Sequence, residues 1–122
     1  MILALLVGLG ASIGAVGRYL LDQAVTRQRP RAFPAGTWVI NVTGSFILGL
    51  LTGLGAHHGL SPHVVTVLGV GVCGGYTTFS TFGYETVRLT EDGLGLIALG
   101  NLLVSVATGM AAAALGLGLA LL

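Results

Sequence analysis

The stretch of sequence that decides the fold is GVCGGYTTFSTF, residues 71–82, where three glycines and four Ser or Thr residues interrupt an apolar run. Glycine destabilises a helix interior by about 1 kcal/mol relative to alanine, and Ser and Thr hydroxyls compete for the helical backbone hydrogen bonds. We therefore expect a helix that breaks or unwinds between about Gly74 and Thr78. A break at membrane depth is tolerated only where it is buried or lines a cavity, and the carbonyl oxygens it frees suit a small cation such as sodium.

The composition around this stretch indicates a membrane protein. Of the 122 residues, 54% are hydrophobic and only 7% are charged, whereas soluble domains carry about 25% charged residues. The formal net charge of +1 gives a nucleic-acid partner no electrostatic support. The lipid bilayer is the expected surrounding.

Apolar runs long enough to cross a bilayer occur at residues 2–21, 37–56, 64–84 and 94–122. The first run has no preceding Lys or Arg, so we interpret it as a retained membrane helix and not a cleaved signal peptide. The connections are too short to hold a soluble domain. The prediction is a single all-α domain, residues 1–122, with four transmembrane helices of which the third is broken near its middle.

Polar residues recur at helical spacing in two of the spans: Thr37, Asn41, Ser45 and Thr52 in the second, and Asn101, Ser105 and Thr108 in the fourth. Polar groups in a membrane are costly unless they pair with each other or line a water path. Hydrogen bonds that hold the helices together are one interpretation, and a donor-lined ion path is the other. The spacing alone leaves the two about equal.

Glycine pairs four residues apart allow close helix contacts, either within one chain or between chains. They are Gly10 and Gly14, Gly49 and Gly53, and Gly71 and Gly75. Phe79 and Phe82, three residues apart, share a helix face. Their electropositive ring edges could face an anion, although contact with lipid or core is the more frequent role of such a pair.

The sequence offers no sign of catalysis. No Asp or Glu lies in the interior of a span, since Asp22 and Glu85 fall near span ends, and a proton-coupled transporter usually needs an intramembrane carboxylate. No cluster of His, Asp and Glu suggests a catalytic metal site, and no nucleophile with a base is recognisable. We therefore expect a protein that is not an enzyme.

The positive charges are distributed unevenly. All five arginines lie at or beside the first and third connections: Arg18, Arg27, Arg29, Arg31 and Arg88. Since Arg-rich short loops stay in the cytoplasm, the simplest topology places both termini outside. The spacing of Arg18 and Asp22, four residues apart, predicts a local ion pair.

The motifs together resemble those of the Fluc/CrcB fluoride channels over essentially the whole chain. The resemblance is carried by residues 71–82 followed by Glu85, by Gly17-Arg18-Tyr19, and by Gly36-Thr37-Trp38 leading into Asn41-Val42-Thr43-Gly44-Ser45-Phe46. It implies an antiparallel, dual-topology dimer in the bacterial inner or plasma membrane. Such a dimer has two narrow pores that conduct fluoride passively and selectively and lower its cytoplasmic concentration.

The resemblance also implies roles for single residues. The pore residues are Phe79, Phe82, Asn41 and Ser105, with Ser80, Thr81 and Thr108 as further hydroxyls. A pore hydroxyl expected one turn after Ser105 is replaced by Gly109. The backbone carbonyls of Gly74 and Thr77 hold a structural sodium ion that is not transported, and Arg18 lies in a vestibule.

Two questions stay open from the sequence. The Arg bias is unusual for a dual-topology protein, so a heterodimer with an oppositely oriented paralogue is the alternative to the favoured homodimer. A small proton-coupled multidrug-type transporter is the alternative function, but residues 2–19 lack the carboxylate it needs. A non-conducting accessory subunit would not require the polar stripes or the broken helix.

Overall fold

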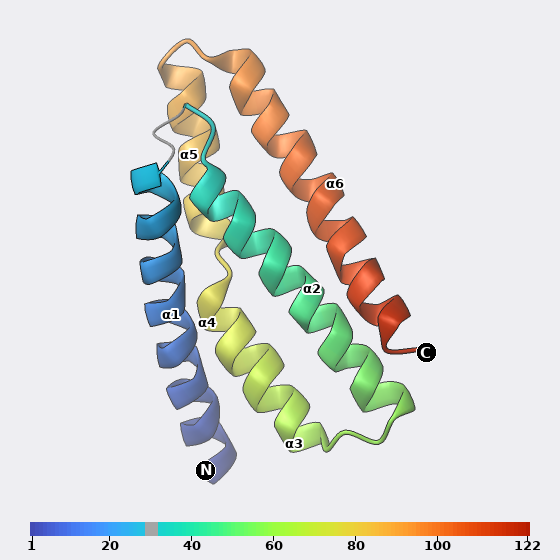
Figure 1. Cartoon of the computed structure of the whole chain (residues 1–122). Coiled ribbons are helices and arrows are strands. Elements are labelled where there is room, and N and C mark those ends of the chain that lie inside the picture. The colour runs from blue at the N-terminus through green and yellow to red at the C-terminus, as the bar shows by residue number, and fades with distance from the viewer. Residues whose placement is uncertain (29–31) are drawn as a thin grey trace.

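The computed structural model describes residues 1–28 and 32–122, in which all regular structure is helical (Figure 1). The helices are α1 Ile2–Gln28, α2 Ala35–His57, α3 Pro62–Val65, the π-helix η1 Thr66–Cys73, α4 Gly74–Tyr76, α5 Phe79–Glu91 and α6 Gly95–Leu119. Helices α3, η1, α4 and α5 follow one another as one interrupted rod, which is the third of the four long elements and is called the third rod below. The α1, α2 and α6 helices and this rod, Pro62–Glu91, are each long and apolar enough to cross a membrane. The predicted all-helical fold with four such elements is confirmed.

Two helices continue beyond the apolar runs that predicted them. The first helix runs to Gln28 instead of about residue 21, and the third rod runs to Glu91 instead of about residue 84. Polar residues at these ends are compatible with a helix, so apolar length underestimates helical length. Helix α5 stops where Gly93 adopts a positive φ of 78°, a conformation that glycine accepts readily.

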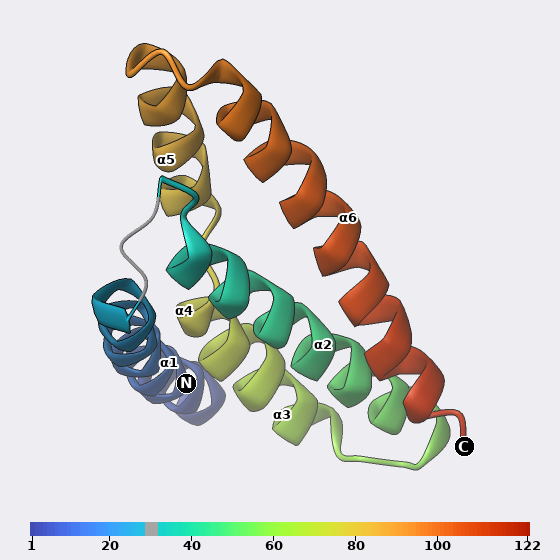
Figure 2. The same ribbon diagram turned by 45° about the horizontal axis from the view of Figure 1, so that its top comes forward.

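The α2 helix is the centre of the arrangement (Figure 2). It packs along α6 on one side and contacts α1 and η1 on the other, while α5 packs against α6. Both termini lie at one end of the bundle, and the connection from α5 to α6 lies at the opposite end (Figure 1). The break between α4 and α5 is therefore placed beside the middle of the bundle.

The glycine pairs serve packing within the chain. A Cβ atom at Gly14 would overlap the backbone of Val72, and one at Gly75 would overlap the backbone of Ala11. Across the α2–α6 contact, a Cβ at Gly49 would overlap the Ala113 carbonyl. These glycines let the helix backbones approach closely, which is the packing interpretation of the pattern.

The π-helix η1 is a feature that the sequence pattern did not predict. At its end the Gly74 N–H donates to the carbonyl of Gly69, five residues earlier. The run is apolar and rich in glycine on all sides, so its periodicity does not distinguish a π-helix from an α-helix. Short π segments occur frequently at functional sites, and this one leads directly into the break.

Candidate functional site at the broken third helix

The break itself consists of two extended residues. Thr77 has a ψ of 158°, and Thr78 has a φ of −147° and a ψ of 123°. Gly74–Tyr76 is still helical, so the break lies at the C-terminal end of the interval that the sequence predicted and is shorter. Gly71 and Gly75 pack against α1, and Gly74 also stays helical; the helix opens at the two consecutive threonines.

Asn41 on α2 holds the break open. Its side-chain Nδ2 donates to the carbonyl of Thr78, and its Oδ1 accepts the Thr78 N–H, both at 2.9 Å. The carboxamide thus supplies a donor and an acceptor to Thr78, whose N–H and carbonyl lie at the break. Backbone groups left without partners at membrane depth cost several kcal/mol each, so the two hydrogen bonds from Asn41 stabilise the break.

The buried side chain of Thr78 caps the helix that follows. Its Oγ1 accepts the backbone N–H of Thr81 at 3.2 Å and donates to the Thr81 hydroxyl at 3.0 Å. The Ser80 hydroxyl lies 3.3 Å from the same oxygen. The structure therefore brings Ser80 and Thr81, two of the predicted pore hydroxyls, together at the N-terminus of α5.

These two side-chain contacts free two particular carbonyls. In an uninterrupted helix the Gly74 carbonyl would accept the Thr78 N–H, and the Thr77 carbonyl would accept the Thr81 N–H. Asn41 takes the first of these donors and the Thr78 hydroxyl takes the second. Gly74 and Thr77 are the residues that the sequence analysis assigned to sodium, and both carbonyls have lost their helical donors.

Arg18 approaches the break from α1. Its guanidinium Nη1 lies 3.4 Å from the carbonyl oxygen of Thr77, to which it donates. The predicted ion pair between Arg18 and Asp22 is wrong: over residues 1–28 and 32–122, Arg88 with Asp92 is the ion pair that forms. Arg18 prefers the freed carbonyl because this acceptor has no helical donor.

The two phenylalanines lie side by side but differ in environment. Their ring centroids are 5.7 Å apart with an angle of 51° between the planes. Phe82 is 8% exposed, while Phe79 is 83% exposed. Phe79 borders a cavity of about 250 Å³ that Asn41, Ser45 and Thr78 also line. The aromatic pair therefore runs from the protein interior to an outer face beside the break.

The polar stripe of α6 is bonded within the chain. Asn101, 1% exposed, donates to the Thr86 hydroxyl at 2.8 Å and accepts from the Ser105 hydroxyl at 3.2 Å. The Thr108 hydroxyl accepts from the indole Nε1 of Trp38 at 2.9 Å. These contacts are of the kind that holds helices together, and they link α6 to α5 and to α2.

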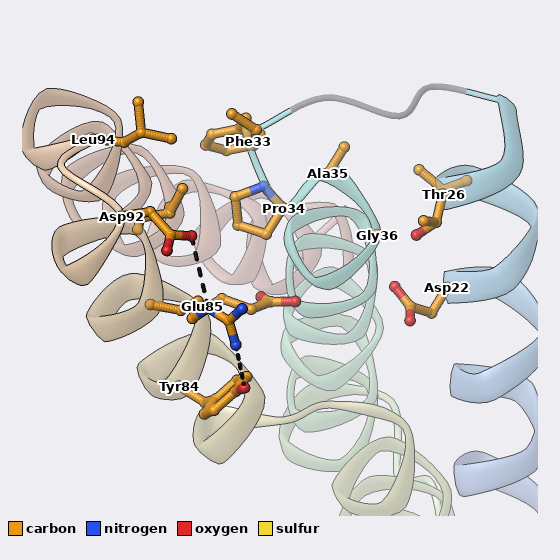
Figure 3. A pocket seen from close by; sticks show the side chains of 14 residues that line it. Asp22, Thr26, Phe33, Pro34, Ala35, Gly36, Tyr84, Glu85, Asp92 and Leu94 are labelled. Atoms are coloured by element: carbon orange, nitrogen blue, oxygen red, sulfur yellow. Dashed lines mark hydrogen bonds and ion pairs between the residues drawn. The ribbon is translucent and has the colours of Figure 1, made fainter.

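Glu85, predicted only as part of a motif, is a further functional candidate. Its Oε1 accepts the Thr37 hydroxyl at 3.0 Å, while its Oε2 is buried and has no hydrogen-bond partner within the described part of the chain. It lines a cavity of about 330 Å³ that Asp22 also borders (Figure 3). The sequence signal that could have pointed to this contact of Glu85 is Thr37, the first residue of the polar stripe of α2.

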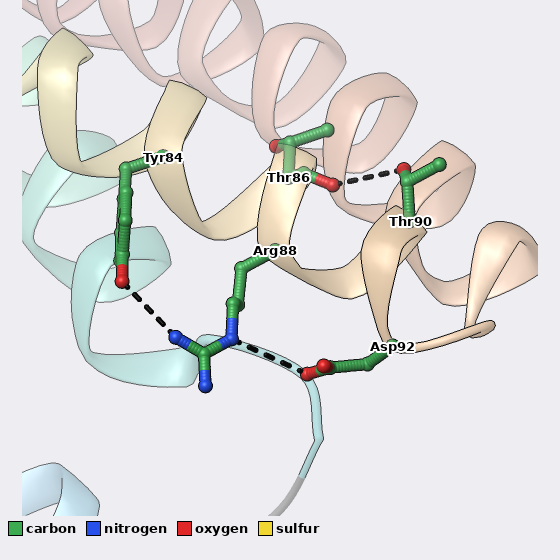
Figure 4. A network of polar contacts seen from close by, with 5 residues as sticks. All are labelled: Tyr84, Thr86, Arg88, Thr90 and Asp92. Carbon is green, nitrogen blue, oxygen red and sulfur yellow. Dashed lines mark hydrogen bonds and ion pairs between the residues drawn. The ribbon is translucent and has the colours of Figure 1, made fainter.

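Arg88, which also lines this cavity, makes a hydrogen bond and an ion pair. The Arg88 Nη1 donates to the Tyr84 hydroxyl at 3.2 Å, and its Nε lies 3.7 Å from Asp92 Oδ2 (Figure 4). The described residues contain no group of three or more His, Cys, Asp or Glu side chains placed to hold a metal ion.

Comparison with known proteins shows the family to which this chain belongs. Residues 5–117 match the model of a family described as CrcB-like protein, Camphor Resistance (CrcB). A protein of Streptomyces avermitilis named fluoride-specific ion channel FluC 1 is 51% identical over 92% of this chain and 90% of its own length. The Frankia casuarinae protein of the same name is 48% identical over 95% of this chain and 94% of its own length. A Mycobacterium tuberculosis protein named fluoride-specific ion channel FluC 2 is 47% identical over 85% of this chain and 79% of its own length.

Proposed function

The chain belongs to the CrcB-like family, and from this premise we propose that it is a fluoride-selective passive ion channel that exports fluoride. It is a multi-pass membrane protein of a bacterial family and not an enzyme. The observation that carries the proposal is the capped, two-residue break beside an aromatic pair, in a chain 51% identical to a relative named as a fluoride channel. Fluoride that enters as the neutral acid is trapped inside as the anion. An open path then lets the membrane potential, worth about 2.3 kcal/mol per 100 mV, expel it.

The proposed path uses ring edges and polar donors in place of the water around the ion. Phe79 and Phe82 would face the anion with their electropositive edges. Ser80 and Thr81, in the same first turn of α5, would add their exposed hydroxyls as donors. Asn41, Ser105 and Thr108 complete the proposed lining, and their contacts inside the chain hold their positions.

The proposed working unit is an antiparallel, dual-topology dimer. Phe79, exposed at 83% in the single chain, would be covered by the partner, which would explain a large apolar ring left unpacked beside polar groups. A homodimer is favoured, and a heterodimer with an oppositely oriented paralogue is the alternative. The Arg bias behind that alternative rests partly on Arg29 and Arg31, which lie outside the described residues. Labelling both termini decides it, since a homodimer requires copies in both orientations.

A structural sodium ion is proposed at the carbonyls of Gly74 and Thr77. The support is that both oxygens have lost their helical donors to side-chain caps. The Thr77 oxygen accepts from Arg18 at 3.4 Å, and its second lone pair remains available as a neutral ligand for sodium. When bound, the ion would supply a fixed positive charge at the break. Arg18, already at the Thr77 carbonyl, supplies positive charge to the proposed vestibule from the protein itself.

The alternative is a small proton-coupled multidrug-type transporter. Its support is Glu85, a carboxyl group with one oxygen buried and without a partner in the described structure. Against it, Glu85 lies near the end of the third rod, whereas proton exchange for a lipophilic cation needs a carboxylate at the centre of the bundle. Proton-driven uptake of a fluorescent cation into vesicles, abolished by Glu85→Gln, would favour the transporter.

The proposal can be tested in cells that lack their own fluoride exporter. Expression of the chain should restore growth in acidic medium containing millimolar fluoride and should leave sensitivity to toxic organic cations unchanged. Protection against the cations without protection against fluoride would contradict the proposal.

A further inference from the structure

The polar stripe of α6 stops at Gly109, one helical turn after Ser105. Four residues separate Asn101 from Ser105 and Ser105 from Gly109, so the three positions share one face of the helix. The neighbouring Thr108 does not fill the gap, because its hydroxyl donates to the carbonyl of Val104 and accepts from Trp38. On α6 the face therefore has no hydroxyl at this level.

A hydroxyl from another helix lies at this gap. The Oγ of Ser45, on α2, is 3.7 Å from the position that a Cβ atom would take at Gly109. That is ordinary van der Waals separation, so a side chain at Gly109 would point at Ser45 without displacing it. The Ser45 hydroxyl of α2 thus lies beside the position on α6 where Gly109 has no side chain.

Ser45 also differs from other hydroxyl residues in the spans. The usual pattern is a hydroxyl that donates to the carbonyl four residues earlier, seen for Ser12, Thr43, Thr52, Thr66, Thr77, Thr86, Thr90 and Thr108. Ser45 has no such bond, and its hydroxyl has no other partner in residues 1–28 and 32–122. A donor left free in a membrane helix is costly unless it meets water or a ligand.

Ser45 also borders the face of the chain where the anion is expected. Ser45 is half-buried and lines the same cavity as Asn41, Thr78 and Phe79. It lies one helical turn after Asn41 on the same face of α2. The cavity therefore combines an aromatic ring, a carboxamide and a hydroxyl whose hydrogen is uncommitted.

We propose that Ser45 is an anion-contacting residue, which donates its hydroxyl hydrogen to fluoride at the level of Gly109 and supplies from α2 the donor that α6 lacks there. The inference rests on the proposed fluoride channel function. A small anion with a high charge density requires replacement donors along its whole path. In this chain the donor track passes from Ser105 on α6 to Ser45 on α2.

The test moves the hydroxyl from one helix to the other. Ser45→Ala should lower fluoride efflux from liposomes by about tenfold, as expected for loss of one hydrogen bond to a charged group. The double variant Ser45→Ala with Gly109→Ser should return efflux to within about threefold of the wild type, because the hydroxyl reappears at the same point. Ser12→Ala is the matched control, since the exposed Ser12 hydroxyl is bonded to its own helix.

The outcomes separate this inference from the function it rests on. If the wild type conducts fluoride and Ser45→Ala, eluting as the wild type does, conducts equally well, the inference is wrong and the channel function stands. If the wild type does not conduct fluoride, the function itself fails. Should Ser45→Ala not fold, Ser45→Cys decides, because the thiol is a weak donor of similar size; wild-type efflux in that variant would overturn the inference.

Discussion

The carboxamide of Asn41 and the backbone of Thr78 form two reciprocal hydrogen bonds of 2.9 Å, so a side chain on α2 takes the place of the helical partners that the third rod loses at its break. The pairing couples two polar features that are 37 residues apart in sequence. It makes the open break a property of the α2–α5 contact and not of the rod alone.

Replacing Asn41 with Leu should destabilise the protein and stop conduction. Two hydrogen bonds worth about 1 kcal/mol each are lost, and the Thr78 N–H and carbonyl are left without partners. We expect an unfolding free energy lower by about 2–4 kcal/mol, measured in detergent, and fluoride efflux lower by at least about tenfold. Thr52→Val is the control, because the Thr52 hydroxyl is bonded to its own helix. Normal stability of Asn41→Leu would show that the pairing does not hold the break.

The cap of α5 should require a hydroxyl at residue 78. Thr78→Ala removes the oxygen that accepts the Thr81 N–H, a change that costs about 1 kcal/mol at a helix N-terminus. Thr78→Ser keeps the oxygen and should keep both stability and flux. Thermal unfolding of the two variants provides the comparison. Equal unfolding temperatures for Ala and Ser would mean that the cap contributes nothing.

How far the sequence could predict this site differs from residue to residue. The break was predictable, because two threonines after a glycine-rich run conflict with a helix. The contact of Asn41 with Thr78 was not: the place of Asn41 on a polar stripe fits a helix-holding contact and an ion path equally, and only the packing of α2 shows that it binds Thr78. The contact between Trp38 and Thr108 and the burial of Glu85 escaped prediction for the same reason, since both depend on how distant helices meet.

Removing sodium tests the freed carbonyls, which no side-chain substitution can delete. Exchange of sodium for a large organic cation such as N-methyl-D-glucamine should lower the thermal stability of the purified protein and its fluoride efflux together. Re-addition of sodium should restore both, and potassium should restore them less well because it is larger. Stability and efflux that do not depend on the cation would remove the sodium site from the account.

The hydrogen bond between Thr37 and Glu85 should show as an energetic coupling. Thr37→Val removes the donor to Oε1 and leaves both oxygens of a half-buried carboxyl without a partner in the described structure, so we expect a loss of about 1–3 kcal/mol in stability. In combination with Glu85→Leu the same change should cost much less. A double-mutant cycle in detergent measures the difference; strictly additive effects would mean that the two side chains do not interact.

The close α2–α6 contact should tolerate no side chain at Gly116. A Cβ there would overlap the carbonyl of Phe46, whereas a Cβ at Gly100 or Gly118 on the same helix meets nothing within 4 Å. Gly116→Val should therefore abolish the folded protein, while Gly100→Ala and Gly118→Ala should be neutral. Yield and elution volume after detergent extraction report the outcome. Wild-type elution of Gly116→Val would contradict the packing described for these helices.

The aromatic pair should separate conduction from assembly. Phe79→Ala removes a ring that is mostly exposed in the single chain, so it should lower fluoride efflux while the protein still elutes as a folded species. Phe82→Ala should also lower efflux, with an additional stability loss of about 3 kcal/mol or more because this ring is buried. Unchanged flux in both variants would exclude the rings from the ion path.

Selective, passive fluoride conduction can be measured as fluoride release from liposomes that contain the purified protein. With a fluoride electrode outside and a potassium diffusion potential set by an ionophore, addition of the ionophore should release fluoride rapidly. Chloride should stay trapped in parallel vesicles, and a proton gradient should not be needed. Retention of fluoride by protein-containing vesicles, equal release of chloride, or release that depends on a proton gradient would contradict the account.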